Sequence, residues 1–226
     1  LAVVTVVAYH AGLSGATGGY LGVSAFFTLS GYLITSLLLV EHDRRGGVSL
    51  RGFWTRRFRR LLPAALATIG GVVVADSGQL ADLRGDVLAG IGYVANWHFV
   101  VDDRSYGELF TGPSPLQHLW SLAIEEQFYV LFPLLTVGLL RLGRGRRHVL
   151  GAVLVALTAA SALWSAHLAG LDGGSSRAYY DTGARAVELL AGSLLAVAVA
   201  GRVERLHRYR RSLGIGGAIA FVGLLA

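Results

Sequence analysis

The chain has 226 residues, of which 54% are apolar and only 15% are charged, and its formal net charge is +6. It contains no cysteine, which excludes a disulfide framework and thiolate chemistry. Apolar runs near the length of roughly 20 residues that a helix needs to cross a bilayer recur throughout. We therefore expect an all-α fold, a polytopic transmembrane helical bundle with about seven or eight visible spans or partial spans.

The basic residues indicate orientation rather than nucleic-acid binding. All 20 are arginines, and 16 of them fall in three clusters, at residues 44–60, 141–147 and 202–211. Each cluster lies between apolar runs, as the positive-inside rule predicts for cytoplasmic loops of a protein integral to the bacterial cytoplasmic membrane. The sequence also lacks methionine and begins and ends within apolar runs. We expect a single domain over residues 1–226 that is an internal fragment, truncated at both ends, of a longer protein.

Residues 1–40 form an uncharged run long enough for two spans, joined by the small residues at 11–19. His10 would lie in the outer half of the first span. A lone histidine on an apolar helix is more often a packing residue than a catalyst, but an imidazole can also act as a base near neutral pH. Ser30, in "TLSGY", is either a nucleophile or, as we favour, a small residue that permits close helix packing.

The segment "FWTRRFRRLLP", residues 53–63, is expected at the inner membrane surface, where it leads into the next span. Arg57 and Arg60 are three residues apart and would share a helix face, with Arg56 one turn behind Arg60. Guanidinium groups match phosphate oxygens in geometry and charge, which slightly favours a phosphate ligand. Attraction to anionic lipid is the alternative interpretation.

Residues 87–101 are expected to form a partial or re-entrant helix. Three apolar stretches separate the first two arginine clusters, yet an even number of crossings is needed if both clusters face the cytoplasm. This stretch has only 15 residues and ends in "NWHFVVDD". Irregular backbone at membrane depth must be covered by protein or line a cavity, which would then lie near Asn96, Trp97 and His98. The alternative is a short ordinary span.

The segment "HLWSLAIEEQFYVLFP" places two adjacent carboxylates, Glu125 and Glu126, within an apolar run. At 100° per residue, one helical stripe holds Glu125 and the polar residues that could support it or contact substrate, namely His118, Ser121 and Tyr129. Charged groups within a membrane are costly and usually functional. Glu126 could instead pair with an arginine, and both carboxylates could simply be solvated at the interface.

Near the end of the chain, "YYDTGARAVELLAGSLLA" adds Arg185 and Glu188 at the outer end of a span. An ion pair between them is the favoured interpretation, and contact with an acceptor sugar is the alternative. Gly192 and Ser193 are predicted to be packing residues.

Five motifs in order resemble the membrane-bound acyltransferase 3 family, which includes bacterial glycan O-acetyltransferases. They are "AVVTVVAYHAG", "GGYLGVSAFFTLSGYLIT", "FWTRRFRRLLPA", "PSPLQHLWSLAIEEQFYVLFP" and "RAYYDTGARAVELLAGSLLA". The resemblance covers essentially the whole chain. Ser24 departs from it, since many relatives carry aspartate at that position, and the arginine typical eleven residues before the histidine would lie upstream of Leu1.

The resemblance implies transfer of an acyl group, usually acetyl, from cytoplasmic acetyl-CoA or another acyl-CoA to a hydroxyl of a glycan or lipid-linked sugar. The family's essential histidine corresponds to His10, its Arg-x-x-Arg motif to Arg57 and Arg60 preceded by Arg56, and its acidic motif to Glu125 and Glu126. No metal is implied, and relatives often carry a fused extracytoplasmic domain. In the resulting hypothesis, the arginines bind the phosphates of the coenzyme, His10 accepts the hydroxyl proton, and a glutamate stabilises the imidazolium.

Two other classes of protein share parts of this pattern. A polytopic transporter of a sugar or acyl carrier would also use membrane carboxylates and broken helices. A structural membrane component would use its arginine clusters only to bind lipid.

Overall fold

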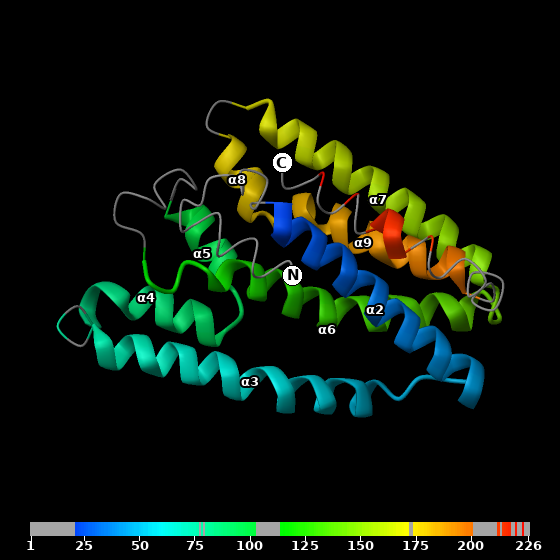
Figure 1. The fold of residues 1–226 in the computed structure, drawn as a ribbon, viewed down its shortest axis with the longest axis horizontal. Coiled ribbons are helices and arrows are strands. Elements are labelled where there is room, and N and C mark those ends of the chain that lie inside the picture. The colour runs from blue at the N-terminus through cyan, green and yellow to red at the C-terminus, as the bar shows by residue number, and fades with distance from the viewer. Residues whose placement is uncertain are drawn as a thin grey trace. The chain divides into compact units, whose positions relative to one another are not determined.

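The computed structural model describes residues 21–76, 78, 80–102, 114–171 and 174–200, together with 212, 214–217, 220 and 223. His10 and the third arginine cluster lie outside the described residues. Within the described part every regular element is a helix, which confirms the all-α prediction. The elements in chain order are α2 (Leu21–Arg45), α3 (Leu50–Ala75), α4 (Leu80–Ile91), α5 (Ala95–Val101), α6 (Leu119–Leu142), α7 (Arg147–Ala169), α8 (Gly174–Tyr180) and α9 (Thr182–Val199) (Figure 1).

Five described helices, α2, α3, α6, α7 and α9, are long and apolar enough to cross a membrane, which makes the chain a multi-pass membrane protein. The other three have 12, 7 and 7 residues and fall short of a full crossing. The expectation of about seven or eight spans or partial spans is therefore not confirmed.

The helix α2 is apolar on both its faces, as expected for a helix with lipid on one side. Its residues Phe27, Ile34 and Leu38 are fully buried. The leucines of the opposite face lie four residues apart and are 47% to 56% exposed, at Leu29, Leu33 and Leu37. An exposed leucine stripe of this kind is favourable only against lipid or a partner.

The chain divides into two compact units, one formed by residues 1–40 and 188–226 and the other by residues 41–187. In the first unit α2 and α9 pack with their backbones in contact. A Cβ atom added to Gly192 would lie 1.8 Å from the Thr28 carbonyl oxygen, and one added to Gly31 would lie 1.9 Å from that of Leu189. Ser193 lies at the same contact and donates a hydrogen bond to the Leu189 carbonyl oxygen, at 2.9 Å. The prediction that Gly192 and Ser193 are packing residues is confirmed.

In the second unit the first two arginine clusters lie at one end of the helices. Arg147, at the start of α7, forms an ion pair with Asp43 in the last turn of α2. One spanning helix, α3, leads away from this end, and another, α6, returns to it (Figure 1). Two crossings therefore separate the clusters, in agreement with the positive-inside interpretation.

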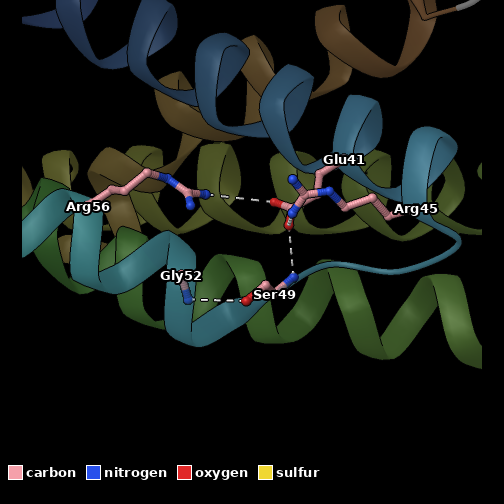
Figure 2. A network of polar contacts seen from close by, with 5 residues as sticks. All are labelled: Glu41, Arg45, Ser49, Gly52 and Arg56. Carbon is pink, nitrogen blue, oxygen red and sulfur yellow. Dashed lines mark hydrogen bonds and ion pairs between the residues drawn. The ribbon is translucent and has the colours of Figure 1, made fainter.

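The turn between α2 and α3 is organised by the largely buried carboxylate of Glu41 (Figure 2). One carboxylate oxygen, Oε1, accepts hydrogen bonds from the Ser49 backbone N–H at 3.1 Å and from Arg45 at 3.4 Å. The other, Oε2, lies 3.8 Å from the guanidinium of Arg56. Ser49 is the N-cap of α3, because its Oγ accepts a hydrogen bond from the Gly52 N–H at 3.2 Å.

The expectation that the next helix follows the segment 53–63 is wrong, because this segment is part of that helix. Its place at the inner membrane surface stays a prediction. A single helix of 26 residues, α3, runs from Leu50 through Pro63 to Ala75. A proline inside a helix removes one backbone hydrogen bond and often bends or breaks it. Here the cap at Ser49 starts the helix 14 residues before the proline, and good helix formers surround it, so the helix continues. The arginines therefore occupy the first turns of a spanning helix.

The prediction that residues 87–101 do not form a full span is confirmed, because this stretch is broken between α4 and α5. The end of α4 is a Schellman motif, in which Val94 N–H bonds the Ala89 carbonyl at 2.9 Å and Tyr93 N–H bonds that of Gly90 at 3.2 Å. The left-handed position of this motif is usually a glycine, but here Tyr93 occupies it with φ of 54°. Both short helices pack against α6.

A buried polar network fixes the hairpin of α4 and α5 to its neighbours. The side chain of Gln127 on α6 donates to the Tyr93 carbonyl and to Asn96 Oδ1, both at 2.9 Å. Asn96 in turn donates to the Tyr180 carbonyl and to Thr182 Oγ1, both at 2.9 Å. Thr182 closes the ring by donating to Gln127 Oε1 at 2.7 Å. The place of Tyr93 relative to α6 is thus set by direct hydrogen bonds.

Candidate functional site

The two glutamates of α6 are buried, at 4% exposure for Glu125 and 3% for Glu126. This rules out the interpretation that they are solvated at an interface. The hydroxyl of Tyr129, one turn further along α6, donates to Glu125 Oε1. The predicted polar stripe is confirmed for this pair.

Two other members of the stripe lie at the start of α6. His118 is exposed, and its carbonyl accepts a hydrogen bond from the Ser121 hydroxyl at 3.3 Å. The described contacts do not bring them to the carboxylates, so their role as support or substrate contacts stays a prediction.

The cation that reaches this cluster is Arg57 of α3. Its guanidinium lies 4.2 Å from the ring centre of Tyr129 and 5.5 Å from that of Phe53. Phe53 is buried, which turns its face of α3 toward α6. Because residues four apart share a helix face, Arg57 also points toward α6. The indole of Trp54 adds a hydrogen bond to the Tyr129 carbonyl, at 3.0 Å. Arg57 also acts electrostatically on Glu126.

The other two candidate phosphate-binding arginines have different surroundings. Arg56 is exposed and lies beside Glu41 (Figure 2). Arg60 is exposed as well. Among the described contacts, Arg57 is therefore the member of the predicted trio that connects to the α6 carboxylates.

Arg185 has an aromatic environment within the second unit. Its guanidinium lies 5.2 Å from the ring centre of Tyr179 and 5.7 Å from that of Trp120. Its predicted pairing with Glu188, which belongs to the first unit, stays a prediction. Ser30, also in the first unit, is buried next to the tightly packed Gly31, which favours the packing interpretation over a nucleophile.

Two functional candidates escaped the sequence analysis, and the first is Tyr93. Its hydroxyl and Glu126 Oε1 are both buried without a hydrogen-bond partner among the described residues. Glu126 also acts electrostatically on the Tyr93 phenol. A possible signal was the aromatic residue directly after Gly92, where the chain turns.

The second is a group of three side chains, Asp86, His98 and Asp102, whose ligand atoms lie within 4.8 Å of one another. His98 Nε2 is 2.9 Å from Asp86 Oδ1 and 3.4 Å from Asp102 Oδ2. Imidazole and carboxylate are ligands for a divalent cation, but these contacts are equally those of an ion pair linking α4 to α5. The prediction of no metal is not tested by this arrangement.

We expect His98→Ala to lower the stability of the hairpin. Asp86 is 2% exposed, so loss of the imidazole removes a partner from a buried carboxylate, which costs about 1–3 kcal/mol. Thermal unfolding of the purified protein in detergent would report this as a lower Tm. The matched control is His148→Ala, at an exposed position, which should leave Tm unchanged. Equal Tm values for the two variants would contradict the linking role.

Comparison with known proteins shows the family of the chain and the class of reaction that this family performs. The chain matches the acyltransferase domain family over residues 1–226. It is 44% identical to peptidoglycan O-acetyltransferase OatA of Listeria monocytogenes over 202 residues, 87% of this chain and 32% of that protein. It is 44% identical to the putative peptidoglycan O-acetyltransferase YrhL of Bacillus subtilis over 200 residues, 87% of this chain and 31% of that protein.

A putative O-acetyltransferase of Staphylococcus aureus (strain COL) is 42% identical over 200 residues, 87% of this chain and 33% of that protein. The chain thus spans about a third of the length of these relatives. No solved structure matches it. The match to the family over the whole chain, together with the sequence identity, shows that this chain belongs to the acyltransferase domain family.

Proposed function

We propose that the protein containing this chain is a membrane O-acyltransferase that moves an acetyl group from cytoplasmic acetyl-CoA to a hydroxyl of a cell-envelope glycan. Family membership and the names of the relatives support the reaction class and the glycan acceptor. The observation that carries the proposal is the stacking of Arg57 on Tyr129, whose hydroxyl donates to the buried Glu125, next to the buried Glu126. Buried charge of this kind within a spanning helix is expensive and therefore usually functional.

The arginine-rich end of α3 is suited to the phosphates of the donor substrate. Arg60 and Arg56 are exposed there, and their guanidinium groups can each bind phosphate oxygens. Arg57, on the same turns of α3, stacks on Tyr129 next to the carboxylates, so it could bind donor and order the cluster at once. From the positive-inside rule we expect this end of the helices to face the cytoplasm, where acyl-CoA is available.

His10 is the proposed base. In the transfer step the acceptor oxygen forms a bond to the thioester carbonyl carbon while its proton passes to His10. The carbon–sulfur bond then breaks, and the imidazolium returns the proton to the departing thiolate. Glu125 or Glu126 would orient and stabilise the imidazolium meanwhile.

The alternative is a transporter of a sugar or acyl carrier. A short broken hairpin packed on a spanning helix with buried carboxylates is also a transporter feature, so this class has a specific observation in its favour. The two functions differ in whether a covalent bond is made.

Mass spectrometry of cell-envelope glycans from strains with and without the gene tests the proposal. We expect sugars that carry one additional acetyl group only when the gene is present, and incorporation of label from isotopic acetate into that group. A transporter would change the location of a sugar without changing its mass. Identical glycan masses in both strains, with the protein present in the membrane, would refute the acyltransferase proposal.

A further inference from the structure

The hydroxyl of Tyr93 and the carboxylate of Glu126 form an incompletely satisfied pair in the second unit. Both Tyr93 OH and Glu126 Oε1 are buried and lack a hydrogen-bond partner among the described residues. Tyr93 lies against the part of α6 that carries Glu126, because the Gln127 side chain, next to Glu126 in sequence, donates to the Tyr93 carbonyl at 2.9 Å. The electrostatic effect of Glu126 on the phenol agrees with this placement. Buried polar atoms are nearly always satisfied, so the pair points to a ligand.

The hydrogen-bonding capacities of the two groups restrict what this ligand can be. A phenol can donate one hydrogen, and an ionised carboxylate can only accept. A thioester carbonyl or a phosphate oxygen could accept from Tyr93 but would leave an ionised Glu126 without a donor. An ammonium group could donate to Glu126 but would leave the Tyr93 hydrogen without an acceptor. A hydroxyl group both accepts and donates, so a sugar hydroxyl or a water molecule satisfies the two at once.

The backbone at Tyr93 is a second, independent observation. Tyr93 has φ of 54° in the left-handed position of the Schellman motif, where a glycine would be free of strain. The glycine of this turn, Gly92, comes one residue before the left-handed position, so that Tyr93 occupies the position instead. A bulky residue kept in such a conformation is typical of functional sites, where the surrounding structure holds it in place. The hydrogen bond from Gln127 supplies that hold.

We propose that Tyr93 and Glu126 form the binding site for the hydroxyl of the acyl acceptor, with Tyr93 donating to the acceptor oxygen and Glu126 accepting its hydrogen until that proton passes to His10 in the transfer step. This inference rests on the proposed function and adds to it the residues that orient the nucleophile. The site would favour any acceptor with an accessible hydroxyl and reject the corresponding deoxy sugar, because the latter would leave both groups unsatisfied.

The test uses the full-length protein in detergent, with acetyl-CoA as donor and a soluble muropeptide as acceptor. We expect Tyr93→Phe to lower kcat/KM for the muropeptide roughly tenfold, the usual value of one hydrogen bond. The KM for acetyl-CoA should change less than the KM for the muropeptide. The thermal stability should be equal or higher, because the variant removes a buried group that has no partner among the described residues. Tyr32→Phe in α2 is the matched control and should resemble the wild type.

A double-mutant cycle separates a shared ligand from independent effects. If Tyr93 and Glu126 hold the same hydroxyl, the loss in Tyr93→Phe plus Glu126→Gln will be smaller than the product of the two single losses. Wild-type kinetics in Tyr93→Phe, independent losses in the cycle, or a lower Tm for Tyr93→Phe would overturn the inference. A larger change in the KM for acetyl-CoA than in that for the muropeptide would assign Tyr93 to the donor and overturn the inference. If the wild type itself transfers no acetyl group, it is the proposed function that fails.

Discussion

Replacing Arg57 with alanine is expected to reduce acetyl transfer by about 100-fold or more, the usual cost of removing one group that stabilises charge in an enclosed site. Arg57 stacks on Tyr129, whose hydroxyl holds Glu125, and it acts electrostatically on Glu126. Without it, two adjacent buried carboxylates would lose a nearby positive charge. Both their orientation and their ionisation would then change.

A neighbouring arginine provides the control for this prediction. Arg59→Ala removes an exposed charge from the same turn of α3. We expect it to retain most of the activity measured with acetyl-CoA and a soluble muropeptide. Arg57→Lys should recover only part of it, because an ammonium keeps the charge but lacks the planar surface that stacks on Tyr129. Equal losses in Arg59→Ala and Arg57→Ala would show that the cluster acts only as a diffuse positive surface.

Several features of this arrangement follow from local sequence pattern. Periodicity at 100° per residue predicts that Glu125 and Tyr129 share a face, and the hydrogen bond between them confirms it. Counting crossings between arginine clusters predicts that residues 87–101 do not span, and the break between α4 and α5 confirms that too. These predictions succeed because each depends on one segment alone. The helix period fixes which residues share a face, and the bilayer thickness fixes how long a spanning helix must be.

Contacts between helices could not be predicted in the same way. The link from Arg56 to Glu41 depends on a turn whose direction is set by the Ser49 cap, and spacing within α3 carries no information about it. The position of Tyr93 depends on Gln127, which is 34 residues away. The continuity of α3 through Pro63 was missed because proline is normally taken as a helix boundary, and the stability of the flanking turns outweighs it.

The contact between α2 and α9 leads to the second prediction, that adding one methyl group at Gly192 will strongly destabilise the protein. A Cβ atom there would lie 1.8 Å from the Thr28 carbonyl oxygen and 2.8 Å from the Tyr32 backbone nitrogen. Backbone atoms cannot move aside as a side chain can, so the helices must separate. Overpacking of this kind costs typically 1–3 kcal/mol, and we expect Gly192→Ala to reach at least about 3 kcal/mol.

Small residues matter here because apolar surface gives little drive to associate helices within lipid, so that stability depends on close packing. Gly138→Ala in α6 is the matched control, since a Cβ atom there would meet no atom of the described residues within 4 Å. The same change should therefore be neutral or stabilising by up to about 1 kcal/mol through helix propensity. Thermal unfolding in one detergent compares the two, and Gly31→Ala should behave like Gly192→Ala because it also meets backbone. If Gly192→Ala and Gly138→Ala melted at the same temperature, α2 and α9 could not be in backbone contact in the folded protein.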